Sequence, residues 1–200
     1  MIRSVLKIGG SLMDVANDLL QSLTKASVDV LIVPGGGPFA EAVRRYSRSL
    51  DDTAAHWMAI LAMNQYGFFI SGKGVDITDV IKDDVSGISV LLPFREVFAC
   101  DPLPHSWDVT SDSIAAWVAH QIDANLVIAT DVDGIRLGNS TVSSVSANDL
   151  TFETCVDSFL PHLLVRYAIN CTVVNGKHFE RVVDAVKGAP TTGTVIRGRE

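Results

Sequence analysis

Two glycine-rich turns near the N-terminus are the segments of this sequence best suited to chemistry. Gly9–Ser11 follows one short apolar run, and Gly35–Gly37 follows the next. Glycine lets the backbone approach a ligand closely, and successive N–H groups in such a turn form a concavity that binds anions. A helix N-terminus directly behind the turn adds free N–H donors. Glycine also serves simple tight turns, but two such turns together predict two phosphate groups, or a phosphoryl donor facing an acceptor.

Lys7 lies in an otherwise apolar run directly before the first glycine turn. A bare ammonium is costly to bury unless it is paired, so Lys7 is the best candidate cation for a phosphate site. Asp112, near an expected helix start, can orient Lys7 through a charge-assisted hydrogen bond. The structural alternatives are a lysine that extends to solvent at a strand end and a carboxylate that only complements a helix dipole.

Two polar turns follow apolar runs in the second half of the chain, at Asp131–Gly134 and Asn175–Lys177. Ligands of parallel α/β sheets bind beyond the carboxyl ends of the strands, so these turns belong with the glycine turns. Asp131 and Asp133 can face a nucleotide or its Mg²⁺, although Asx-turn chemistry explains them equally well. Lys177 can approach the nucleotide phosphates or be an ordinary surface lysine.

Apolar periodicity predicts strands and helices that alternate along the chain. Strands are expected over 4–8, 28–33, 88–92, 94–99 (an edge strand), 126–129, 171–174 and 191–196, the last of which closes the sheet. Helices are expected over 14–25, 39–48, 53–66, 159–167 and 179–187. Asp52 or Thr53 can cap the third of these, and a further helix is expected to run from a cap at Thr110 or Ser111 to about 121. This alternation predicts an α/β fold, a three-layer sandwich with a mostly parallel central sheet. One domain is expected over 1–200, with a soft division into lobes 1–121 and 122–200.

The bulk composition is that of a globular protein. The 200 residues are 48% hydrophobic and 20% charged, which excludes a mainly disordered chain. The net charge of −7 disfavours a nucleic-acid coat. No apolar run approaches the roughly 20 residues that span a bilayer, so no membrane partner is expected. Three widely spaced cysteines without a CxxC pair indicate reduced thiols and a cytoplasmic protein.

The order of the motifs is more specific than any one of them. There is no GxxxxGK[ST] segment and no GxGxxG after a strand, so neither a P-loop nor a dinucleotide site is predicted. Instead, the chain resembles the amino acid kinase family, which includes acetylglutamate, uridylate and isopentenyl phosphate kinases. The segments that carry the resemblance are, in order, 7–12, 33–38, 110–116, 130–135, 174–177 and 192–194. It implies the amino acid kinase fold, ATP with Mg²⁺ as phosphoryl donor, a small-molecule acceptor and a homo-oligomer.

The resemblance also implies a role for each candidate residue. Lys7 would contact the transferred phosphoryl group, with Asp112 beside it as the second catalytic residue. His56 would donate to an acceptor phosphate and Trp107 would shape the acceptor pocket, although a structural histidine and a core tryptophan are the alternatives. The nucleotide side would comprise Gly9, Gly10, Ser11, Thr130, Asp131, Asp133, Gly134, Asn175, Gly176 and Lys177, and the acceptor side Gly35, Gly36, Gly37, His56 and Trp107.

Within the family, the chain is most similar to the small archaeal-type kinases of methanofuran biosynthesis. These phosphorylate an aminomethylfuran phosphomonoester to its diphosphate, and an acid such as Asp108 can pair with the aminomethyl cation. The resemblance rests on the short length and on segments 56–58, 64–67, 105–112 and 154–161. The alternatives are an isopentenyl phosphate or uridylate kinase, a carboxylate kinase, and a non-catalytic nucleotide sensor.

The chain departs from the family in one segment. Many members carry a second phosphate-binding lysine before the penultimate strand, whereas Thr154–Phe159 contains no lysine. The second cation is therefore expected from Arg44, Arg45, Lys73 or Mg²⁺ itself. The missing lysine is also what keeps the sensor hypothesis open.

Overall fold

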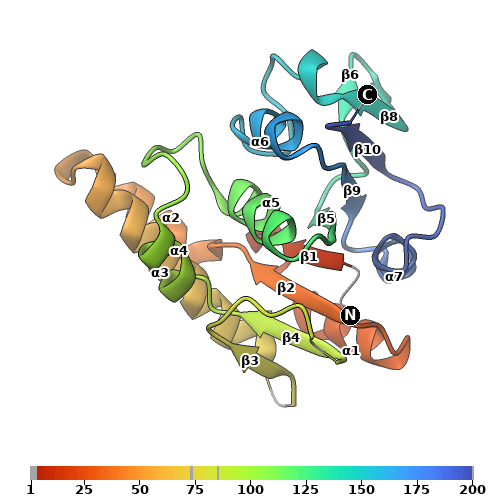
Figure 1. Cartoon of the computed structure of the whole chain (residues 1–200), viewed down its shortest axis with the longest axis horizontal. Helices are drawn as coiled ribbons and strands as arrows, with labels where there is room; N and C mark the ends of the chain where they lie inside the picture. The colour runs from red at the N-terminus through yellow and green to blue at the C-terminus, as the bar shows by residue number, and fades with distance from the viewer. Residues whose placement is uncertain (1–3, 73, 85, 200) are drawn as a thin grey trace.

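A mostly parallel sheet carries the fold, and helices cover both of its faces (Figure 1). The computed structural model describes residues 4–72, 74–84 and 86–199, and within them the sheet has eight strands in the order β3-β4-β2-β1-β5-β9-β10-β8. The predicted α/β sandwich is therefore confirmed. The strands of this sheet are β1 (Ser4–Ile8), β2 (Val30–Pro34), β3 (Asp76–Thr78), β4 (Ile88–Leu91), β5 (Asn125–Thr130), β8 (Ser144–Ser146), β9 (Cys171–Asn175) and β10 (Thr194–Arg197). A separate hairpin joins β6 (Arg136–Leu137) and β7 (Ser140–Thr141).

Strand β1 lies at the centre and fixes where the polar turns meet. It pairs in parallel with β2 on one side and β5 on the other, so Ile8 lies opposite both Pro34 and Ala129. Strand β9 continues the parallel order beyond β5, with Ala129 opposite Val174. The carboxyl ends of these four strands therefore share one edge, and the four predicted turns follow them there. Strands from both sides of residue 122 belong to this one sheet.

Alternation along β1 sends its side chains to two different helical layers. Leu6 and Ile8 lie in a core with helices α1 (Ala16–Lys25) and α7 (Phe179–Val186). Val5 lies in a second core on the opposite face, together with α5 (Ser111–Gln121) and α6 (Leu160–Tyr167). Lys7 shares the face of Val5 and is thereby directed toward α5.

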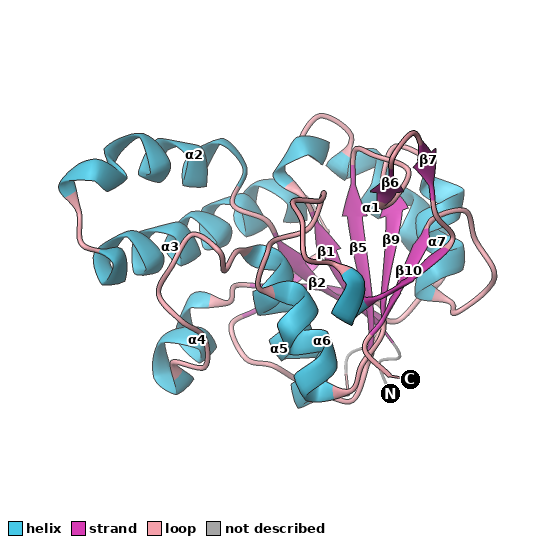
Figure 2. Ribbon diagram, turned by 90° about the horizontal axis from the view of Figure 1, so that it is seen from above, coloured by secondary structure: helices cyan, strands magenta, loops and turns pink. Residues whose placement is uncertain are grey.

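Helices α2 (Gly37–Tyr46) and α3 (Asp52–Ser71) form an arm that extends away from the sheet in Figure 2. Helix α3 begins one residue earlier than predicted, because the Asp51 carboxylate, rather than Asp52 or Thr53, accepts the capping hydrogen bond from the Ala54 N–H at 2.8 Å. It ends at Ser71 instead of 66, since its apolar sequence continues to pack against the sheet as far as Ile70.

The predicted edge strand at 94–99 is wrong, because this segment forms helix α4 (Phe94–Cys100). Its aromatic and β-branched residues suggested a strand, but Phe94, Val97 and Phe98 have helical spacing. Val97 is buried, and the Trp57 ring of α3 makes edge contacts with both Phe94 and Phe98. Tertiary packing thus decides the state of this segment.

The remaining predicted elements form, with small shifts at their ends. Strand β10 does not close the sheet as predicted. It runs antiparallel to β9, and the short polar strand β8, which its sequence did not reveal, lies outside it. None of the described helices is both long and apolar enough to cross a membrane.

Candidate functional site

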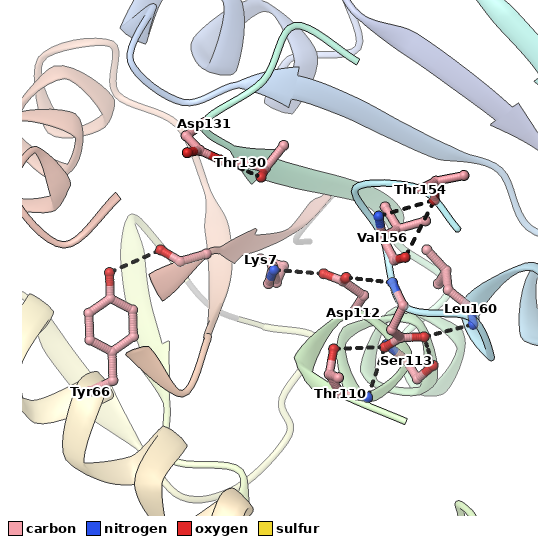
Figure 3. A network of polar contacts seen from close by, with 12 residues as sticks. Lys7, Tyr66, Thr110, Asp112, Ser113, Thr130, Asp131, Thr154, Val156 and Leu160 are labelled. Atoms are coloured by element: carbon pink, nitrogen blue, oxygen red, sulfur yellow. Dashed lines mark hydrogen bonds and ion pairs between the residues drawn. The ribbon is translucent and has the colours of Figure 1, made fainter. Parts of the chain in front are cut away.

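A buried ion pair lies at the centre of the site (Figure 3). Lys7 Nζ is 2.7 Å from Asp112 Oδ1, and the two residues are only 8% and 4% exposed. Lys7 comes from the end of β1 and Asp112 from the first turn of α5. The structure thus brings together the two residues that the sequence analysis placed at the catalytic centre.

Asp112 is held in place by a second acid that the sequence analysis did not single out. The backbone N–H of Asp157 donates to Asp112 Oδ2 at 3.1 Å. The Asp157 carboxylate in turn accepts hydrogen bonds of 2.7–2.9 Å from backbone and hydroxyl groups at the start of α5 and from the start of α6. These donors belong to Thr110, Ser113 and Leu160.

Asp157 also explains how α5 begins. Thr110 occupies the N-cap position, as predicted, but its hydroxyl donates to Asp157 Oδ2 instead of capping the helix. Burial, and then the neighbouring Asp112 carboxylate, raise the pKa of Asp157, while the hydrogen bonds from Ser113 and Thr110 oppose this rise. Segment 154–159, which contains no lysine, therefore supplies the backbone N–H that contacts Asp112 and the carboxylate that holds the start of α5.

The two glycine turns are in direct contact. A Cβ on Gly10 would overlap Gly37 Cα, and a Cβ on Gly35 would lie 3.0 Å from the Gly10 nitrogen. The buried Tyr66 of α3 joins them, because its hydroxyl donates to the Gly9 carbonyl at 3.1 Å while its ring lies beside Gly37, which has φ +52°. The two glycine turns thus lie side by side, and a side chain at Gly10 would force them apart.

The other two predicted turns lie at the same edge of the sheet, on the far side of β1. The Gly176 N–H donates to the Thr130 carbonyl at 2.7 Å, which ties the β5 and β9 turns together. The Asp133 carboxylate accepts hydrogen bonds from Arg181 at 2.7 Å and from Asn175 at 3.1 Å. Both hydrogen bonds lower the pKa of Asp133, and the one from Asn175 has the larger effect. The remaining predicted nucleotide-side residues include Ser11, Asp131 and Lys177, which are exposed. They also include Gly134, where a Cβ would overlap the Thr194 side chain.

A cavity of about 390 Å³ opens beside the glycine turns and runs along the α2–α3 arm. Helix α2 lines it with residues at helical spacing, and one face of α3 and the start of α5 complete its wall. The residues that carry the argument below are Gly37, Glu41, Arg44, Asp52, His56 and Trp107.

The predicted acceptor residues lie at different depths in this cavity. His56 precedes Tyr66 by ten residues on α3, about 15 Å along the helix axis, so it lies far from the glycine turns. The Arg44 guanidinium lies over the Trp107 ring at 4.4 Å from its centroid. Of the proposed second cations, Arg44 lines the cavity and Arg45 does not, whereas Lys73 lies outside the described residues. Asp108 does not line the cavity and accepts from Ser158 Oγ instead.

His56 is a buried imidazole in an aromatic group. Its ring stacks on His105 at 4.3 Å between centroids and meets Trp57 edge-on at 4.8 Å, and its Nε2 has no hydrogen-bond partner among the described residues. Burial, and then the neighbouring His105, lower the pKa of His56 from 6.5 to about 4, while Asp101 opposes the shift. His56 is therefore a neutral group at pH 7.

A parallel sheet whose strands end in two touching glycine turns has known relatives. The model of the amino acid kinase family matches residues 3–152 of the chain. The chain belongs to the amino acid kinase family. It is 35% identical, over 97% of both chains, to [5-(aminomethyl)furan-3-yl]methyl phosphate kinase of Methanocaldococcus jannaschii. The predicted family resemblance is thus confirmed.

Solved structures of the family share the fold. Uridylate kinase from Archaeoglobus fulgidus superposes with a TM-score of 0.73 at 19% identity, covering 97% of this chain and 99% of that one. UMP kinase from Ureaplasma parvum superposes with a TM-score of 0.71 at 19% identity, covering 98% and 99%.

Asp157→Ala is expected to lower the free energy of unfolding by about 2–3 kcal/mol, because it leaves several buried donors at the start of α5 and α6 without an acceptor. Urea denaturation followed by circular dichroism measures the change. Asp108→Ala is the matched control, since this exposed acid accepts a side-chain hydrogen bond only from Ser158 Oγ among the described residues. Equal losses in the two variants would contradict the role given to Asp157.

His56 is expected to make the fold sensitive to acid. In the unfolded chain its imidazole binds a proton as the pH falls through about 6.5, whereas in the folded protein it does so only near 4. The stabilisation is therefore complete above pH 6.5 and is lost as the pH falls from 6.5 to 4. His56→Gln should flatten the dependence of Tm on pH in this window, and identical slopes for the two proteins would rule out the effect.

Proposed function

We propose that this protein is an ATP-dependent kinase that transfers the γ-phosphoryl group to [5-(aminomethyl)furan-3-yl]methyl phosphate and so forms a diphosphate for methanofuran biosynthesis. The observation that carries the proposal is the 35% identity, over 97% of both chains, to the kinase that bears this name. The contact between the two glycine turns beside a buried lysine supports the proposal, since phosphoryl transfer needs phosphates held next to a cation.

On the donor side, the first glycine turn and the turns after β5 and β9 would hold ATP. The turn of Gly9, Gly10 and Ser11 would contact its phosphates through the N–H groups of Gly10 and Ser11, since the Gly9 N–H already donates to the Ala129 carbonyl at 3.0 Å. The remaining nucleotide residues would be Thr130, Asp131, Asp133, Gly134, Asn175, Gly176 and Lys177. In this proposal residues 1–121 form the acceptor side and 122–200 the nucleotide side of one domain.

On the acceptor side, the turn of Gly35, Gly36 and Gly37 would hold the acceptor phosphate at the N-terminus of α2. The helix dipole and the N–H groups of Gly36 and Gly37 favour an anion there, whereas the Gly35 N–H already donates to the Ile8 carbonyl at 2.8 Å. The organic part would then extend into the cavity along the arm. Trp107 lines the cavity and would contact the acceptor's organic end, whereas His56, about 15 Å along α3 from Tyr66, would line the outer end of the cavity beyond a short acceptor. This placement revises the hypothesis that His56 donates to the acceptor phosphate.

The transfer itself needs no general base, because the attacking phosphate oxygen is already anionic. That oxygen attacks the γ-phosphorus in line, the bond from phosphorus to the β–γ bridging oxygen breaks, and ADP leaves with that oxygen. Lys7 neutralises charge that gathers on the phosphoryl oxygens during transfer. Asp112 keeps the ammonium aimed, since its carboxylate lies 2.7 Å from Lys7 Nζ.

Mg²⁺ would accompany ATP. It prefers one or two carboxylates together with phosphate oxygens and water, and Asp131 offers an exposed carboxylate at the nucleotide edge. Asp133 is less suited, because Arg181 and Asn175 already occupy its Oδ1. The described residues hold no group of three or more His, Cys, Asp or Glu side chains able to bind a metal ion, and this fits an ion that takes most of its ligands from the nucleotide. When bound, it would supply charge neutralisation between the phosphates.

Three free cysteines, Cys100, Cys155 and Cys171, fit a reducing compartment, and we propose a cytoplasmic location.

ADP formation from ATP and Mg²⁺, measured with a panel of acceptors, tests the proposed function. The aminomethylfuran phosphomonoester should give the highest kcat/KM, above isopentenyl phosphate and UMP. Lys7→Ala should reduce turnover by at least about 100-fold, since it removes charge stabilisation of the transition state, and this variant also excludes a contaminating kinase. Turnover with a carboxylate acceptor alone, or ATP binding without any turnover, would overturn the proposal.

We also propose that two or more copies associate through the outer face of α3. Met58, Leu61 and Phe68 lie at helical spacing on this face and are 40%, 42% and 60% exposed. Light scattering coupled to size exclusion should report an oligomer for the wild type and a smaller species for Phe68→Asp. A wild-type monomer at micromolar concentration would contradict this association.

A further inference from the structure

The acceptor cavity has opposite electrical character at its two ends. Its inner end is formed by the glycine turns and the N-terminus of α2, which favour an anion. Farther out, its lining carries two carboxylates, Glu41 and Asp52, against one guanidinium, Arg44. We propose that Glu41 is the specificity-determining residue of this site and accepts hydrogen bonds from the ammonium group of a bipolar acceptor. This inference rests on the proposed function and deepens it.

Helix geometry places Glu41 at the right distance from the phosphate. It follows Gly37 by four residues, so its Cα lies about 6 Å farther along α2, on the same face. Gly37, Glu41 and Arg44 all line the cavity. With standard bond lengths, an extended aminomethylfuranmethyl phosphate spans about 8 Å from phosphorus to nitrogen. An acceptor whose phosphate rests at Gly37 therefore brings its amine beside Glu41.

The Glu41 carboxylate is free to take a ligand. It is half-exposed, and its closest cation is Arg44, whose Nε lies 3.8 Å from Oε2, beyond hydrogen-bond distance. Arg44 is itself held over the Trp107 ring. Within the described part of the chain, no hydrogen bond reaches the Glu41 side chain, so its lone pairs can accept from an alkylammonium group.

The charge of the cavity favours this kind of acceptor over its neutral counterparts. His56 adds no positive charge at pH 7, because burial lowers its pKa to about 4. A phosphomonoester with a neutral tail would meet the Glu41 carboxylate and gain no contact from it. A tail that ends in an ammonium group gains an ion pair instead, so Glu41 selects for the amine and against its neutral analogues.

Asp52 carries the same charge in the same cavity but lies too far away to make this contact. It precedes Tyr66 by fourteen residues on α3, about 21 Å along the axis, and the Tyr66 ring lies next to Gly37. An acceptor held at the glycine turns cannot span this length. Asp52→Asn therefore serves as a charge-matched control for Glu41→Gln.

The experiment compares the full-length wild type, Glu41→Gln and Asp52→Asn on two acceptors. One is the aminomethylfuran phosphomonoester, and the other is the same molecule with methyl in place of aminomethyl. Glu41→Gln should lower kcat/KM for the amine by about 10- to 100-fold, the range expected for a lost hydrogen bond to a charged group. Its kcat/KM for the methyl analogue should change by less than about threefold, and Asp52→Asn should keep the wild-type preference.

The outcomes separate the two proposals. If the wild type phosphorylates neither acceptor, the proposed function fails. If the wild type phosphorylates the amine but Glu41→Gln affects both acceptors equally, or neither, the role of Glu41 is overturned while the function stands. The role of Glu41 would also be overturned if Asp52→Asn lost as much of the preference for the amine as Glu41→Gln does. The preference would then come from the overall negative charge of the cavity and not from a contact with Glu41.

Discussion

The Lys7–Asp112 ion pair is the interaction on which the rest of the structure depends. Two buried charges must recover a large desolvation cost, and they do so only when their geometry is well held. The fold holds them from both sides. The central strand β1 fixes Lys7, and the hydrogen bonds of Asp157 fix the first turn of α5, which carries Asp112. An ammonium kept in this way is ready for a phosphoryl group, because it needs little reorganisation when charge develops beside it.

The central position of β1 also explains why the site has two halves. Its parallel partners on either side end at the same edge, so one turn before α2 and two turns after β5 and β9 flank the turn that carries Gly9 and Gly10. Contact between the glycine turns leaves no room for a Cβ at Gly10. The glycines are thus required by packing as well as by ligand approach. Tyr66 links this edge to the α2–α3 arm and so connects the phosphate end to the acceptor cavity.

Much of this arrangement could be predicted from sequence, since it depends on local signals. Apolar runs that end at Gly9, Gly35, Asp131 and Asn175 predicted both the parallel strands and the edge where their turns meet. The function of Asp157 could not be predicted, because its partners at Thr110 and Ser113 lie more than forty residues away along the chain. Glu41 was missed for a related reason: an exposed acid on an amphipathic helix looks like a solvated face until the opposing wall of the cavity is known. Helix α4 was misassigned because its aromatic residues pack against Trp57, a contact that is remote in sequence.

The absence of a lysine from segment 154–159 affects the electrostatics of the centre. This segment brings Asp157 next to Asp112, so the described charged groups joined around the ion pair are two carboxylates and one ammonium. Burial, followed by the neighbouring Asp112 carboxylate, raises the pKa of Asp157. Two phosphate groups entering such a centre must bring positive charge with them, which Mg²⁺ bound to ATP supplies in the proposed reaction. The protein's own remaining cation near the acceptor, Arg44, lies over Trp107 in the cavity wall. In the proposed reaction, Lys7 would lie at the transfer point and the ligands would supply the rest of the compensation, while Glu41 would select the far end of the acceptor.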